Sequence, residues 1–188
     1  MTISIDEPSV KVLTFKARGI TPLIVHKWSE KAKKEMRDKQ QKKAAKAKSA
    51  KDCDQEYRDS MYLLEDGSHG FPAVAFKLAA VRAGKLLGLT MTDLRQMFHV
   101  LADEVDLVRI EGTPQMREDP VKIPGSADLR YRAEYPDWSA TLQVKYVADF
   151  ITAEQLVNLF ETAGMTVGVG EWRPEKNGQF GQFTLRDY

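Results

Sequence analysis

The sequence contains only one cysteine, Cys53, and no apolar run that approaches the ~20 residues needed to cross a bilayer. A single cysteine cannot form an intramolecular disulfide, which favours a reducing compartment. The first twelve residues lack the basic and apolar pattern of a secretory signal. We therefore expect a cytoplasmic protein that does not contact membranes.

Sequence motifs of common enzyme classes are missing as well. There is no GxxxxGK[ST] phosphate-binding loop and no GxSxG nucleophile turn. The histidines, His26, His69 and His99, are not at metal-ligand spacing, and Cys53 has no CxxC partner. Acidic residues are scattered, without a paired motif for acid–base catalysis. We expect no enzymatic activity, no metal and no cofactor.

Basic residues, in contrast, are concentrated in one segment of a nearly neutral chain. Residues 27–51 contain eleven basic and three acidic residues, a net charge of +8, whereas the remaining 17 basic and 24 acidic residues give −7. This asymmetry is typical of a surface that binds a polyanion, although a solvated helix that aids solubility would have the same composition. The residues expected to follow phosphates are Lys27, Lys31, Lys34, Lys42 and Lys46.

Outside this segment, hydrophobic periodicity predicts an alternation of strands and helices. The strands are expected over residues 11–18, continued after Gly19 over residues 20–28, and over residues 105–111, 140–150 and 183–186. The helices are expected over residues 73–87, 92–101 and 153–163. Pro72 precedes the first helix, Thr152 and Gln155 form a capping box before the last, and Gly164 would end it. Residues 112–138, rich in proline, should form loops with short extended pieces.

This order of elements predicts an α+β fold, a ferredoxin-like or RRM-like sandwich with helices on one face of the sheet. We expect residues 1–188 to form a single domain. Residues 28–62, which have strong helix formers but few large apolar residues, would be a basic inserted helix or arm.

Further basic residues lie outside the arm. Lys77, Arg82 and Lys85 fall within about 140° of one another on the first predicted helix. Arg130 and Arg132 alternate with aromatic residues that include Tyr131, Tyr135 and Trp138. Aromatic and basic side chains together suit base stacking and phosphate contact on a single strand, and packing inside the protein is the alternative.

The segment 164–183 is the second distinctive feature, with five glycines around a charged run. It does not have the GxGxxG spacing of a dinucleotide site, and it follows a helix instead of opening one. We interpret it as a loop whose backbone approaches something closely. Its displayed side chains would be Trp172, Arg173 and Lys176, and its loop glycines are Gly168, Gly170, Gly178 and Gly181.

These features together resemble the RAMP superfamily, in particular the backbone subunits of CRISPR effector complexes. The resemblance rests on the predicted order of elements, the basic insertion and the sequence "GVGEWRPEKNGQFGQF" before the last strand. It implies a single-stranded guide RNA coated by a filament, a "thumb" at residues 28–62, and a glycine loop with Arg173 and Lys176 as its basic members. Residues 127–183 also look like uncharacterised bacteriophage proteins with a "GEWRPEK" core, which would place the protein in the host cytoplasm.

We therefore expect a non-enzymatic protein that binds single-stranded DNA or RNA with low sequence specificity and self-assembles into a ring or filament. One alternative is a phage structural or assembly protein whose basic arm contacts an acidic neighbouring subunit. A second is a RAMP-type RNA endonuclease that uses His26 or His99.

Overall fold

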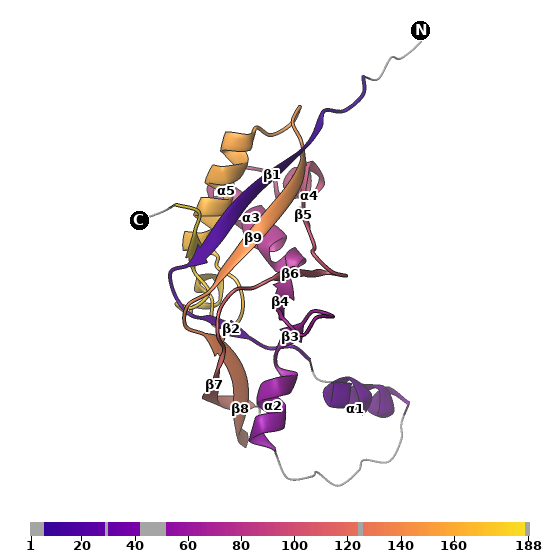
Figure 1. The fold of residues 1–188 in the computed structure, drawn as a ribbon, viewed down its shortest axis with the longest axis vertical. Coiled ribbons are helices and arrows are strands. Elements are labelled where there is room, and N and C mark those ends of the chain that lie inside the picture. The colour runs from indigo at the N-terminus through magenta and orange to yellow at the C-terminus, as the bar shows by residue number, and fades with distance from the viewer. Residues whose placement is uncertain (1–5, 29, 42–51, 124–125, 187–188) are drawn as a thin grey trace.

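The computed structural model describes residues 6–28, 30–41, 52–123 and 126–186. Its main sheet has four antiparallel strands in the order β10-β1-β9-β5. These are β1 (Val10–Gly19), β5 (Phe98–Leu101), β9 (Ser139–Val147) and β10 (Phe183–Thr184). Helix α3 (Ala73–Leu86) lies between β1 and β5 in the chain, and α5 (Ala153–Thr166) between β9 and β10. This β-α-β-β-α-β order confirms the predicted α+β class, with the topology of ferredoxin-like folds (Figure 1).

The core lies between this sheet and the two helices, which pack against each other. Along β9, buried residues alternate with exposed ones, as the sequence predicts. Phe160 of α5 joins the layers, because its ring meets Phe15 of β1 edge-on at 5.0 Å and Phe98 of β5 at 5.7 Å. The capping box of Thr152 and Gln155 at the start of α5 is also confirmed.

The open face of the main sheet differs from an RRM platform. Its outward residues on β1 and β9 include Val12, Thr14, Gln143 and Lys145, none of which is aromatic. The aromatic residues of these strands face the helices instead, where they pack in the core. Stacking of bases on this face is therefore not supported by its composition.

The helix predicted over residues 92–101 is too long. Helix α4 (Met91–Met97) ends where the backbone of Phe98 becomes extended, and Phe98–Leu101 form the edge strand β5. The strand predicted over residues 105–111 does exist, as β6 (Leu107–Arg109), but it belongs to a small separate sheet. That sheet also contains β3 (Tyr62–Leu63) and β4 (His69–Pro72).

Residues 112–138 are wrongly predicted as loops. They form a long hairpin of β7 (Gln115–Ile123) and β8 (Ser126–Tyr135), which β2 (Leu23–Val25) extends to a three-stranded sheet. Pro120 lies on β7, which is an edge strand of this sheet, the kind of strand in which proline is found. Gly164 also differs from its prediction, since α5 continues past it to Thr166.

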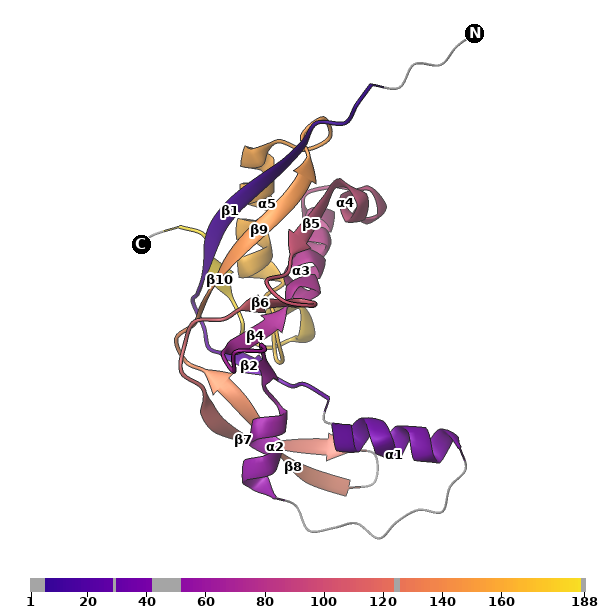
Figure 2. The same ribbon diagram turned by 45° about the vertical axis from the view of Figure 1, so that its right-hand side comes forward.

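The basic arm begins with α1 (Glu30–Gln40) and returns through α2 (Cys53–Asp59). Helix α2 packs against β8, whereas α1 lies away from the main sheet in both views (Figures 1 and 2). Within the described ranges, no helix is both long and apolar enough to span a membrane.

Candidate nucleic-acid interface

The glycine-rich segment is an ordered loop that closes onto β2. Within the loop, the Val169 N–H donates a hydrogen bond to the Gly181 carbonyl oxygen at 2.9 Å. The loop is also hydrogen-bonded to β2, because the Glu171 N–H donates to the Ile24 carbonyl oxygen at 2.9 Å. A short 3-10 turn, η1 (Pro174–Lys176), forms its tip. The loop therefore holds the main sheet and the β2-β8-β7 sheet together.

The four loop glycines make room for the chain itself. At Gly181, whose φ is +68°, an added Cβ would overlap the Val169 carbonyl oxygen. At Gly170, a Cβ would lie 2.5 Å from the Ile24 carbonyl oxygen. A Cβ on Gly168 would lie 2.9 Å from Pro174 Cδ, and a Cβ on Gly178 would overlap the Trp172 carbonyl oxygen. The close approach predicted from the sequence is present, and the loop's own residues and β2 provide it.

Trp172 is displayed at the loop's surface. Its side chain is 44% exposed, although tryptophan is among the most hydrophobic of side chains. Its φ of +53° lies in the left-handed region, which costs a residue with a Cβ about 1–2 kcal/mol. Strained and exposed residues of this kind cluster at binding sites, where the surrounding structure holds them in place.

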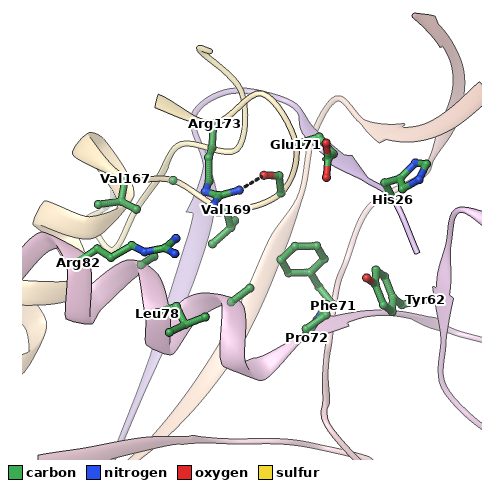
Figure 3. A pocket seen from close by; sticks show the side chains of 14 residues that line it. His26, Tyr62, Phe71, Pro72, Leu78, Arg82, Val167, Val169, Glu171 and Arg173 are labelled. Carbon is green, nitrogen blue, oxygen red and sulfur yellow. Dashed lines mark hydrogen bonds between the residues drawn. The ribbon is translucent and has the colours of Figure 1, made fainter. Parts of the chain in front are cut away.

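Two arginines and one carboxylate connect the loop with α3. Glu175 Oε2 accepts from Arg82 Nη1 at 2.7 Å and from Arg173 Nη2 at 2.8 Å. Arg173 Nη1 also donates to the Gly170 carbonyl at 2.9 Å, which fixes its guanidinium (Figure 3). Two cations share one anion, so this junction has an excess positive charge. Two exposed lysines are close to these residues in the sequence: Lys85 follows Arg82 on α3, and Lys176 follows Glu175 on η1.

A pocket of about 260 Å³ lies between α3, the loop and the ends of β2 and β3. Arg82 and Arg173 lie at one end, and His26, Tyr62 and Glu171 at the other (Figure 3). The walls between them are largely apolar: Phe71, Pro72, Ala75, Leu78, Ala79, Val167 and Val169.

The polar end of this pocket, at His26, lies near charged residues of the β2-β8-β7 sheet. Burial lowers the pKa of His26, and the neighbouring Arg132 lowers it further. Arg132 itself is 2% exposed, and burial lowers its pKa too. Its Nη1 is 3.5 Å from Asp119, within ion-pair range, and Arg117 bridges Asp119 and Glu134 at 2.9 and 2.8 Å. A buried Arg132 cannot belong to the surface footprint predicted for it.

The other predicted residues are not brought together as one surface. Lys77 turns to β5, where its Nζ is 3.1 Å from His99 Nδ1, so it does not share an edge with Arg82. Lys27 lies over the Tyr62 ring at 6.0 Å from its centroid, and Arg130 is half-buried on β8. Lys31 and Lys34 are on α1, with Lys34 exposed. Lys42 and Lys46 lie outside the described residues.

Two aromatic residues proposed for stacking are structural instead. Trp138 is buried and donates from Nε1 to the Thr21 carbonyl at 2.9 Å. Tyr135 is buried and its hydroxyl is 2.5 Å from His69 Nδ1. The packing alternative is therefore correct for both.

Sequence reasoning missed Tyr62, Phe71, Glu171 and Glu175. Tyr62 and Phe71 come from the return of the arm and from β4, and only the fold brings them to the loop. Glu171 and Glu175 do lie in the glycine-rich segment, and the position of Glu175 two residues after Arg173 was a signal for an internal ion pair.

Neither the known protein families nor the curated proteins include a match to this sequence. Among solved structures, the chain is similar to the crystal structure of Cmr6 from Pyrococcus furiosus. The similarity covers 95% of this chain and 99% of that one, at 12% sequence identity and a TM-score of 0.46. The function proposed below rests on the residues of this chain and not on that likeness.

Proposed function

We propose that this protein binds single-stranded nucleic acid without cleaving it, and that several copies coat one strand as a ring or filament. The observation that carries the proposal is Trp172, held exposed in a left-handed conformation directly before Arg173 and close to Lys176. An exposed aromatic ring among cations suits a strand whose bases stack while its phosphates are neutralised.

The distribution of charge supports the same proposal. The junction of Arg82, Arg173 and Glu175 has one cation in excess, and the arm adds the most basic part of the chain. Such contacts recognise phosphates rather than bases, so we expect low sequence specificity and strong dependence on salt.

Replacing Trp172 tests the proposal. Trp172→Ala should weaken binding of a fluorescent single-stranded oligonucleotide by about 1–3 kcal/mol, the value of one stacked base, in an anisotropy titration. Alanine at this position has the same backbone strain as tryptophan, so any loss of stability should come only from the covered part of the ring. Phe150→Ala is the matched control, because Phe150 is 67% exposed and lies at the opposite end of α5.

Equal affinities for wild type, Trp172→Ala and Phe150→Ala would reject stacking on Trp172. The absorbance ratio at 260 and 280 nm of the purified protein separates this proposal from an assembly protein. Co-purified nucleic acid favours the former, and nucleic-acid-free oligomers favour the latter. Negative-stain images with and without an oligonucleotide would test for rings or filaments.

One observation favours an RNA endonuclease as a second candidate. Burial lowers the pKa of His99, as do Lys77 and Lys145, and burial also lowers the pKa of Lys77. A neutral imidazole beside two lysines could remove a proton from a 2′-hydroxyl while the lysines stabilise charge on the phosphate. This candidate requires that labelled RNA be cleaved by the wild type and remain intact with His99→Ala.

A further inference from the structure

The pocket between α3 and the glycine loop has unpaired polar groups at one end only. Of the described residues, none forms a hydrogen bond or ion pair with the Glu171 carboxylate or the Tyr62 hydroxyl. His26 Nδ1 is buried and also has no hydrogen-bond partner there. Three polar groups that converge on an apolar pocket and bond nothing are the mark of a binding site. At the other end, Arg82 and Arg173 are already held by Glu175.

The walls and size of the pocket suit one planar aromatic ligand. Phe71 is central, and its ring meets Tyr62 edge-on at 6.0 Å and Phe76 at 5.9 Å, so it is held in place from both sides (Figure 3). Leu78 and Val169 complete an apolar slot. A volume of about 260 Å³ holds a single heterocycle with part of its sugar, and not a stack of bases.

The two ends differ in charge in the way that a nucleotide does. The junction with Arg82 and Arg173 has two cations for one carboxylate, which suits a phosphate. Glu171 at the other end offers only acceptor oxygens when ionised, so it selects a ligand edge that carries N–H donors. A carboxylate there would repel a carbonyl oxygen.

We propose that this pocket binds one nucleobase turned out of the bound strand, and that Glu171 selects a base with an exocyclic amino group: cytosine, adenine or guanine. The inference rests on the single-strand binding proposed above and adds one base-selective position to it. Glu171 accepts from the amino group, as carboxylates do from cytosine N4, and Phe71 packs against the ring. The phosphate lies toward Arg82 and Arg173. Thymine and uracil have no exocyclic amino group and present carbonyl oxygens to the carboxylate, so they bind less well.

The test compares the affinities of oligo(dC), oligo(dA) and oligo(dT) of equal length by anisotropy. The wild type should bind oligo(dC) and oligo(dA) about fivefold or more tightly than oligo(dT). Glu171→Gln should reduce this preference below about twofold, mainly by improved binding of oligo(dT), because an amide can also donate to a carbonyl. Glu154→Gln is the matched control: it removes the same charge at an exposed site on α5, and should keep the preference.

A second variant tests the apolar part of the pocket and leaves its polar end unchanged. Leu78 lines the pocket and is 38% exposed, so Leu78→Trp should fill the slot while the protein folds normally. It should lower the preference for oligo(dC) and keep most of the affinity for oligo(dT).

The outcomes separate this inference from the function on which it rests. No binding of any oligonucleotide rejects the proposed function itself. Tight binding of all three by the wild type with equal affinity rejects the base pocket and leaves single-strand binding in place. A preference that persists unchanged in both Glu171→Gln and Leu78→Trp also rejects the pocket.

Discussion

At the scale of single residues, sequence reasoning found the positions with special backbone geometry but not their partners. The glycines of the loop were recognised from their spacing, and Gly168, Gly170 and Gly181 indeed have positive φ. What they approach is a neighbouring turn of the loop and Ile24 of β2, almost 150 residues earlier in the chain. No local pattern contains that pairing, because it depends on how the two sheets meet.

The close approach at Gly181 predicts a large loss of stability on substitution. Gly181→Ala would place a Cβ against the Val169 carbonyl at a left-handed φ, so we expect a loss of about 3 kcal/mol or more in the free energy of unfolding measured in urea. Gly67→Ala is the control, because Gly67 has a similar φ of +80° but open space around it. Its cost should be about 1 kcal/mol, from the backbone alone. Equal losses for the two variants would contradict the close approach.

The buried His26 predicts a pH dependence of stability. Burial and Arg132 hold its pKa below the ordinary 6.5, so the unfolded chain takes up a proton at a pH where the folded protein does not. Stability is therefore greatest above pH 6.5 and falls as the pH drops through that value toward the lowered pKa. His26→Gln should remove more of this dependence, in urea midpoints measured from pH 7.5 to 5.5, than His99→Gln, whose site is more exposed. An unchanged dependence in His26→Gln would show that other groups cause it.

At the scale of elements, strongly periodic segments were predicted well and ambiguous ones were not. β1, α3, β9 and α5 follow their periods over nine or more residues, and the structure confirms them. Phe98 and Leu101 complete a helical stripe, and the segment Phe98–Leu101 also fits a strand. β8 does alternate, with Asp128, Arg130, Arg132 and Glu134 at every second position, but Pro120 within β7 and the other prolines nearby favoured a loop, so the hairpin was not predicted.

The arm is the element on which nucleic-acid binding depends most in this account. Replacing Lys31, Lys34, Lys42 and Lys46 together by glutamine should lower the affinity for a single-stranded oligonucleotide about tenfold or more at low salt. The free energy of unfolding should change by less than about 0.5 kcal/mol, because α1 stands apart from the core (Figure 2). The control replaces Lys11, Lys16, Lys122 and Lys145, an equal loss of charge outside the arm. If both variants lose the same affinity, net charge rather than the arm explains binding.

At the scale of the whole molecule, the α+β class and the ferredoxin-like order were predictable because the chain order of helices and strands restricts the topology. The second sheet was not, since β2, β7 and β8 meet only after the chain has passed through the arm and the first half of the core. The candidate site lies where these parts meet. Arg82 and Arg173 of the pocket, and the exposed Trp172 beside it in the sequence, could be found from the sequence, whereas Tyr62 and Phe71 required the fold.

The central claim, electrostatic binding of a single strand, is tested most directly by the salt dependence of affinity. An anisotropy titration of the wild type against one labelled single-stranded oligonucleotide should give log K falling linearly with log salt concentration. With four or more phosphate contacts, the slope should be about −3 or steeper, at roughly −0.7 per contact on a single strand. Binding that does not change with salt, or no binding at low salt, would contradict the account.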